Sequence, residues 1–308
     1  MPAVANNPLV TVIIATFNSA QTLKLSIESV LAQDFTDYEV WIVGDACTDH
    51  SQQVVHSFAD KRLHWINLAT NSGSQGVPNN EGIRRARGDY IAYLGHDDLW
   101  FPWHLSGLVS FIQQTKADLV HPLSAVYSPA GLEYTVGPPG IYRTYKNHFV
   151  NPSSWLHHRQ LIEDCGFWGD HLPLSRGVDM DFLRRVYLAG KQILFYPRLD
   201  LLKFPSGWWG TYAADFHPPQ AKYIEAMKSN PLCLEREILI EAATLLARRI
   251  HSEIPVRQAL VYLFRSLIHL TADFCGPDNW LLERFRFWHF QRHNRIFRKK
   301  RGLPPYRR

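Results

Sequence analysis

The stretch VTVIIATFN at residues 10–18 marks where regular structure begins and which fold class follows. Its first six residues are an almost unbroken apolar and β-branched run, which is typical of a strand buried on both faces. Asn18 and Ser19 then provide the polar side chains that precede a helix, and Leu23, Ile27 and Val30 follow at helical spacing. A buried strand followed directly by an amphipathic helix indicates the start of an α/β fold.

The alternation of strand and helix continues through the first 125 residues. Strands are predicted at 38–43, 63–68, 90–94 and from 119, and helices at about 54–58, 78–87 and 105–112. Such a pattern predicts a mostly parallel, Rossmann-like sheet flanked by helices, and ligand sites of these sheets lie beyond the carboxyl ends of the strands.

The second half of the chain has a different character. Gly and Pro concentrate at 128–152, which predicts a long loop or hairpin, and two helices and a strand at 193–196 follow. Beyond about residue 215 the chain is helical and aromatic. We therefore predict two parts, an α/β domain at 1–215 and a helical, basic extension at 216–308.

The net charge of +5 is unevenly distributed along the 308 residues. Residues 281–308 hold ten Lys or Arg and one acidic residue, a balance of +9 that leaves −4 for the rest of the chain. An acidic body excludes a general polyanion-binding surface, so nucleic acid is not an expected partner. Trp and Phe lie among the arginines of the tail, which favours either contact with an anionic membrane surface or a helix packed on the domain with its charges in solvent.

Four scattered cysteines without a C-x-x-C pair argue against a zinc site or a disulfide scaffold and fit a reducing compartment. The N-terminus has no signal-peptide pattern, and no apolar run reaches the length that spans a bilayer. We expect a cytoplasmic protein, with peripheral attachment to the inner face of the plasma membrane as an open alternative.

Carboxylates follow two of the predicted strands. Asp45 can accept a hydrogen bond from a nucleobase N–H or a ribose hydroxyl, although it can also be a plain turn residue. Asp97 and Asp98 stand side by side after the strand at 90–94, where their charges repel. A divalent cation bridging to phosphate oxygens relieves that repulsion, with His96 as a further candidate ligand. Helix capping by Asp98 would explain only one of the two carboxylates.

Two further polar segments have both a functional and a plain interpretation. The loop at 71–82, which includes Asn80, can lay backbone N–H groups and amides against a ligand or can be an ordinary turn. Asp179 and Asp181 begin a helix, where the dipole favours carboxylates. Their spacing points them to different faces, so only one can face a given cleft.

Together these segments resemble the inverting glycosyltransferases of family two, which have the GT-A fold. The matching pieces occur in the family's order over about residues 8–200: VTVIIATFN, TLKLSIESVLAQ, YEVWIVGDACTDHS, NSGSQGVPNNEGI, ARGDYIAYLGHDDLW, HHRQLIEDCGFWGD and GVDMDFLRRVYLAG. The resemblance implies a hexosyltransferase-type enzyme of bacterial surface polysaccharide or glycolipid synthesis. It further implies a nucleotide-sugar donor, expected to be a UDP-sugar, and a saccharide or lipid-linked acceptor.

The resemblance also implies roles for individual residues. Asp97 is similar to the last Asp of the family's D-x-D, which holds Mn²⁺ or Mg²⁺ against the diphosphate, and Asp98 stands beside it. Asp179 is similar to the Asp of the E-D motif, the general base that deprotonates the acceptor hydroxyl in a direct displacement with inversion. Residues expected on the donor nucleotide are Thr16, Asn18, Asp45, Asn80 and His96.

Four positions depart from the family pattern. Gly44 and Gly95 stand where acidic residues are usual, Asn79 where Arg is usual, and Val178 replaces the Glu of E-D. These departures motivate an alternative, a noncatalytic sugar-nucleotide-binding or scaffold subunit. The retention of Asp45, Asp97 and Asp179 favours the enzyme.

Overall fold

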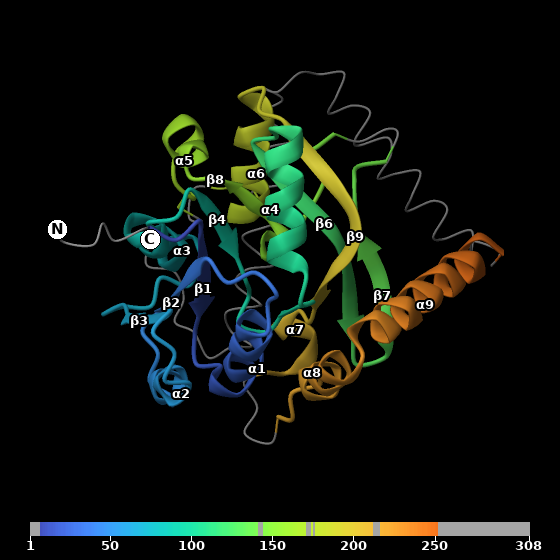
Figure 1. The fold of residues 1–308 in the computed structure, drawn as a ribbon, viewed down its shortest axis with the longest axis horizontal. Coiled ribbons are helices and arrows are strands. Elements are labelled where there is room, and N and C mark those ends of the chain that lie inside the picture. Colours follow the sequence, from blue (N-terminus) through green and yellow to red (C-terminus); the bar gives the residue numbers. More distant parts are fainter. Residues whose placement is uncertain (1–6, 141–143, 171–173, 175, 212–215, 252–308) are drawn as a thin grey trace.

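The computed structural model describes residues 7–140, 144–170, 174, 176–211 and 216–251. One mixed sheet runs through these residues in the strand order β3-β2-β1-β4-β8-β6-β9-β5, with β7 paired to β6 at the side (Figure 1). Its strands are β1 (Val10–Thr16), β2 (Tyr38–Gly44), β3 (Leu63–Asn67), β4 (Tyr90–Tyr93), β5 (Leu99–Trp100), β6 (Leu119–Ser128), β7 (Gly131–Val136), β8 (Leu156–His158) and β9 (Ile193–Lys203).

The strand directions decide where a ligand site can form. Strands β1 to β4 pair in parallel, β8 runs antiparallel to both β4 and β6, and β9 runs parallel to β6. Two reversals restore the original direction, so β6 and β9 point the same way as β1. The carboxyl ends of β1, β2, β4 and β9 therefore lie along one edge of the sheet, where ligands of such folds bind.

Helices cover both faces of the sheet, as the alternating pattern predicted. They are α1 (Ala20–Leu31), α2 (Ser51–Ser57), α3 (Gly76–Arg85), α4 (His104–Thr115), α5 (Gln160–Cys165), α6 (Val178–Leu188), α7 (Ser206–Trp209), α8 (Gln220–Ser229) and α9 (Pro231–His251), with a short 3₁₀ turn at Pro152–Ser154. The helix predicted to start at Pro78 begins two residues earlier, with the proline in its first turn, where its missing N–H costs nothing.

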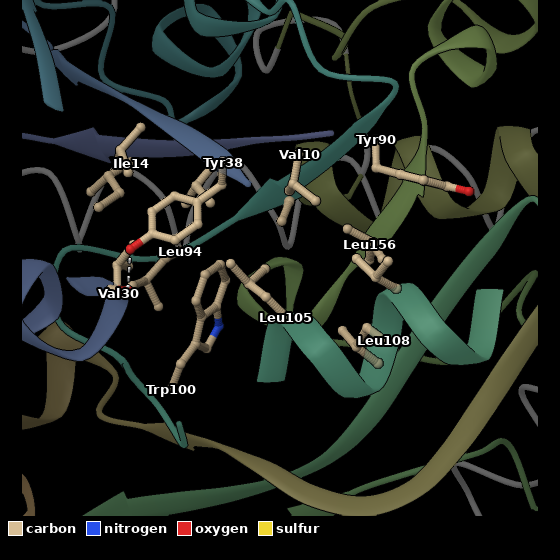
Figure 2. Close-up of a cluster of buried hydrophobic side chains, with 14 of the residues drawn as sticks. Val10, Ile14, Val30, Tyr38, Tyr90, Leu94, Trp100, Leu105, Leu108 and Leu156 are labelled. Carbon is tan, nitrogen blue, oxygen red and sulfur yellow. Dashed lines mark hydrogen bonds between the residues drawn. The ribbon is translucent and has the colours of Figure 1, made fainter. Parts of the chain in front are cut away.

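Alternate residues of β1 face two separate cores. Val10, Val12 and Ile14 pack with α1 and α4, in the cluster that Figure 2 shows with Trp100, Leu105 and Leu108. Within it, the Tyr38 hydroxyl donates to the carbonyl of Val30 at 2.9 Å. Ile13 points the other way, into a cluster built with α3 and α6. Burial on both faces explains why β1 is an almost unbroken run of apolar and β-branched residues.

The first helices of the predicted extension pack against the sheet. Ile224 and Met227 of α8 and Leu234 and Ile238 of α9 share a buried cluster with residues of β5, β6 and β9. The basic tail at 281–308 falls outside the described residues, so its contact with a membrane or with the domain stays a prediction. None of the helices described combines the length and apolarity that crossing a bilayer requires.

Candidate active site

Residues from four strand ends lie along the carboxyl edge of the sheet. Thr16 ends β1, Asp45 follows β2, Asp97 and Asp98 follow β4, and Lys203 ends β9. Asp179 joins them from the first turn of α6. The charge of Lys203 acts on the pKa of Asp98 and, more weakly, on that of Asp179. The edge thus gathers three predicted carboxylates around one ammonium that the sequence had not indicated.

Asp45 shapes the loop that follows β3. Its Oδ1 accepts from the Ser72 N–H at 2.8 Å, and its Oδ2 accepts from the Ser72 hydroxyl at 3.0 Å and the Gly73 N–H at 3.2 Å. The Asn71 amide also donates to the Asp45 carbonyl at 2.9 Å. Asp45 is buried and rigidly oriented, and the loop at 71–73 is folded over the end of β2 by these bonds.

Thr16 and Asn18 lie where β1 turns into α1. Asn18 has a left-handed backbone, with φ of 43°, and its Oδ1 accepts from the Thr48 N–H at 2.8 Å. This bond joins the end of β1 to the loop after β2. The hydroxyl of Thr16 is buried without a hydrogen-bond partner among the described residues, so it is a polar atom that a ligand could satisfy.

Asn80 joins helix α3 to the segment before α6. Its Nδ2 donates to the Trp168 carbonyl and its Oδ1 accepts from the Trp168 N–H, both at 2.9 Å. The amide therefore fastens α3 to the segment that precedes α6. Both ends of the side chain are engaged with the backbone, and binding of the donor by Asn80 stays a prediction.

His96 is oriented by a carbonyl of β1. Its Nδ1 lies 3.2 Å from the Ala15 oxygen, and its Nε2 is buried with no hydrogen-bond partner in the described part of the chain. When Nδ1 carries the proton and donates to Ala15, Nε2 is left as an acceptor, a tautomer assigned from this contact. An oriented imidazole with an unpartnered nitrogen suits a ligand hydroxyl or a cation.

Asp98 is engaged within the protein at both carboxylate oxygens. Its Oδ1 accepts from the Phe204 N–H at 3.0 Å, and its Oδ2 accepts from the Ser153 hydroxyl at 2.5 Å and from Lys203 Nζ at 2.8 Å. The residue is fully buried, which raises the pKa of Asp98, and the Lys203 ammonium opposes that rise. Lys203 is therefore a cation that relieves the Asp97–Asp98 repulsion, and the role of Asp98 as a metal ligand stays a prediction.

Asp97 keeps one oxygen available. Its Oδ2 accepts from the Ser206 N–H at 2.9 Å, and its main-chain carbonyl accepts from the Gln220 amide at 2.8 Å. Its Oδ1 makes no hydrogen bond to a described residue. No group of three or more His, Cys, Asp or Glu that could hold a metal occurs within the described ranges. Mg²⁺ is commonly held by one or two carboxylates plus substrate phosphates. Asp97 Oδ1 is an oxygen of the kind that such a cation takes together with a phosphate, and His96 Nε2 is a second candidate ligand.

Gly95 leaves no room for the first Asp of a D-x-D motif. A Cβ there would lie 2.8 Å from Asp98 Oδ2 and 2.9 Å from Asp97 Oδ1. The carboxylates of the next two residues thus occupy the space that another side chain would need. Glycine at position 95 therefore makes room for the side chain of Asp98 to turn inward.

Restoring the motif should therefore harm the protein. We expect Gly95→Ala to lower the free energy of unfolding by about 1–3 kcal/mol through overpacking, and Gly95→Asp to lower it further by adding a third carboxylate. Urea denaturation measures both, and Gly140→Ala is the control because a Cβ at Gly140 meets nothing within 4 Å. Unchanged stability of Gly95→Asp, with tighter Mn²⁺ binding, would contradict this account.

Asp179 is presented by a firmly packed helix. Its Oδ1 accepts from the Met180 N–H at 2.8 Å, and its neighbour Asp181 turns instead to Arg185, with Oδ2 to Nε at 2.9 Å. The two carboxylates point to different faces, as their spacing predicted. Beneath α6, Phe182 stacks on Trp168 with ring centroids 5.3 Å apart, which holds the helix in place.

Burial raises the pKa of Asp179, against the opposing effects of two backbone N–H groups and of Lys203. Because the folded pKa lies above the unfolded one, ionisation at pH 7 costs stability, and this cost disappears below the unfolded pKa of about 4. Asp179→Asn is therefore expected to unfold at higher urea than the wild type at pH 7, with the gap closing toward pH 4. A variant less stable than the wild type at pH 7 would show that burial does not dominate.

Sequence analysis did not identify Lys203 as a site residue, because β9 is longer than the strand predicted at 193–196. The strand was predicted to end at Tyr196, before Pro197, whereas it continues to Lys203 with register shifts opposite Pro122 and Leu123. A proline interrupts the hydrogen-bond ladder, and the irregular register accommodates it. The mostly apolar run LDLL before Lys203 was the feature of the sequence that could have shown the longer strand.

The two-residue β5 and three-residue β8 were also not predicted, because strands this short have no period.

Two sequence relatives support the resemblance to the glycosyltransferase family. The succinoglycan biosynthesis protein ExoO of Rhizobium meliloti is 39% identical over 108 residues, which is 35% of this chain and 31% of that protein. The UDP-Glc:alpha-D-GlcNAc-diphosphoundecaprenol beta-1,3-glucosyltransferase WfaP of Escherichia coli is 32% identical over 108 residues, 35% of this chain and 43% of that protein. The chain thus aligns with less than half the length of either relative.

Solved structures support the fold. TarS 1–349 of S. aureus in complex with UDP-GlcNAc matches with a TM-score of 0.58 and 20% identity, over 97% of this chain and 93% of that chain. At this identity the likeness concerns the fold alone, and it confirms the predicted GT-A fold. The family model described as "Glycosyl transferase family 2" matches residues 11–165, half of the chain, and this protein therefore belongs to that family.

Proposed function

We propose that the protein is an inverting, metal-assisted glycosyltransferase that moves a hexose from a UDP-sugar to a hydroxyl of a saccharide or lipid-linked saccharide. The observation that carries the proposal is the arrangement of Asp97 and Asp179, from β4 and α6, around Lys203 at the carboxyl edge of the sheet. A single-displacement transfer needs a base on one side of the reacting carbon and charge stabilisation of the leaving group on the other. The similarity to the UDP-Glc-dependent glucosyltransferase WfaP and to the TarS complex with UDP-GlcNAc supports a UDP-sugar as donor.

In this proposal each residue has a defined task. Asp179 accepts the proton of the acceptor hydroxyl as that oxygen bonds to the anomeric carbon, and the bond from this carbon to the diphosphate oxygen breaks. Asp97 and His96 would hold a divalent cation, which supplies Lewis-acid stabilisation of the leaving diphosphate. Residues proposed to bind the donor nucleotide are Thr16, Asn18 and Asp45. The attack comes opposite to the leaving group, so the anomeric configuration inverts.

The proposed setting is bacterial surface polysaccharide or glycolipid assembly, in the cytoplasm. The names of ExoO and WfaP support the setting. Cys47, Cys165 and Cys233 are free thiols in the described residues, which fits a reducing compartment. Attachment of the tail at 281–308 to the membrane's inner face is kept as a proposal that liposome co-sedimentation at low salt would test.

The decisive experiment is a panel of nucleotide sugars with Mn²⁺ or Mg²⁺, in which released nucleoside diphosphate is measured. We expect release from one donor, strengthened by its acceptor and absent with Asp179→Asn. Binding of a donor without release under any condition would favour the noncatalytic alternative, which Gly95 and Asn79 motivate. Absence of both binding and release would overturn both functions.

A further inference from the structure

Lys203 neutralises the buried Asp98, and it does so from the ligand edge of the sheet. It ends β9, 105 residues after Asp98 in sequence, and its Nζ lies 2.8 Å from Asp98 Oδ2. The same short segment supplies the Phe204 N–H to Asp98 and the Ser206 N–H to Asp97, at 3.0 and 2.9 Å. Residues 203–206 thus form a clamp that orients both carboxylates of the site.

The ammonium has donors left over. An ammonium has three N–H donors, and Asp98 Oδ2 is the hydrogen-bond acceptor that the described residues offer to Lys203 Nζ. The Lys203 side chain is 19% exposed, so part of it reaches the surface at this edge. The remaining N–H groups of Lys203 can therefore donate to an anion bound at the ligand edge of the sheet.

Three carboxylates act on Lys203 at this edge of the sheet, so binding an anion there requires a cation. Burial lowers the pKa of Lys203, but the charges of Asp98, Asp97 and Asp179 outweigh burial and raise it, so the ammonium stays charged. A diphosphate brought against Asp97 and Asp179 would meet like charges unless a cation lay among them.

We propose that Lys203 is a donor-binding residue whose ammonium, held by Asp98, contacts the diphosphate of the nucleotide. The inference rests on the proposed function, since it assigns a further residue of the same site. Lys is a compact point charge that binds phosphate without demanding a planar fork. A purely structural alternative is that Lys203 only neutralises the buried Asp98.

A double variant separates these two roles. Lys203→Met leaves Asp98 buried and unpaired, which can destabilise the fold, whereas Lys203→Met with Asp98→Asn replaces the ion pair by a neutral one, a change that proteins often tolerate. Binding of UDP and of uridine is measured by calorimetry on the full chain, with Mg²⁺ and with a chelator. Uridine lacks the phosphates, so it reports on the integrity of the nucleoside pocket alone.

We expect the double variant to bind UDP about 10- to 100-fold more weakly, which is the loss of one charge-assisted hydrogen bond, and uridine as the wild type does. Lys203→Arg should retain most UDP affinity. Lys191→Met is the matched control, because Lys191 is also ion-paired, to Asp164 and Asp118, at the far end of β9. It should bind both ligands normally.

Two outcomes overturn the inference, and they differ from failure of the proposed function. Wild-type UDP affinity in the double variant assigns Lys203 to the fold alone. Equal weakening of UDP and uridine assigns it to the shape of the pocket. If the wild-type protein binds neither UDP nor any other nucleoside diphosphate, the proposed function fails and this inference fails with it.

Discussion

Asp179→Asn is expected to abolish sugar transfer while the protein folds and binds its donor normally. A positioned general base contributes about 10²–10⁴-fold to a reaction rate, and the amide cannot accept the acceptor's proton. The substitution is nearly isosteric, and its Oδ1 can still accept from the Met180 N–H that orients the native carboxylate. The measurement is release of nucleoside diphosphate with the donor and acceptor that the panel identifies.

Asp181→Asn is the matched control for this prediction. Asp181 lies in the same first turn but pairs with Arg185, so its neutralisation should leave the rate within a few-fold of the wild type. Normal turnover by Asp179→Asn would remove Asp179 as the base. Loss of donor affinity together with rate would instead indicate that Asp179 binds the donor.

Asp97→Asn is expected to remove most activity and the dependence on Mn²⁺ or Mg²⁺ together. A bound cation contributes several kcal/mol to stabilisation of a leaving phosphate, and an amide is a much poorer ligand than a carboxylate. Asn is chosen over Ala because an amide oxygen can still accept from the Ser206 N–H, so the start of α7 is preserved. Manganese binding, followed by paramagnetic resonance with UDP present, gives a readout independent of turnover.

The control for Asp97 is an exposed acid outside the site. Asp164 pairs with Lys191 at the surface, and Asp164→Asn should leave both manganese binding and activity unchanged. Wild-type activity that persists undiminished in a chelator would count against the metal role of Asp97. In that case Lys203 would be the cation left to stabilise the diphosphate.

Much of the fold could be predicted from the sequence because its signals are local. Val10 to Ile14 are nearly all apolar or β-branched, which indicates that β1 is covered on both sides. The helix and strand periods that follow predict the parallel half of the sheet. β8 and β5 could not be predicted, since three and two residues are too few to show a period. The extension of β9 past Pro197 was hidden by a residue that usually ends a strand.

The candidate site could be predicted only in part. Asp97 and Asp179 were identified by their positions after a strand and at a helix start, together with the family resemblance. Asp98 and Asn80 were placed in the site on the same grounds, yet their hydrogen bonds go to Lys203 and Trp168, which lie 105 and 88 residues away. A sequence shows which side chains follow a strand, but not which of them turn inward.

What the sequence determined by itself was the α/β class, the edge at which the ligand residues gather, and the family. These follow from the period of apolar residues and from motifs in order, which are properties of neighbouring residues. The tertiary structure alone decided that Asp98 belongs to Lys203 and that Asp97 keeps an oxygen available. The physical reason is that a buried carboxylate must find a partner, and the partner comes from whichever distant strand end the sheet brings beside it.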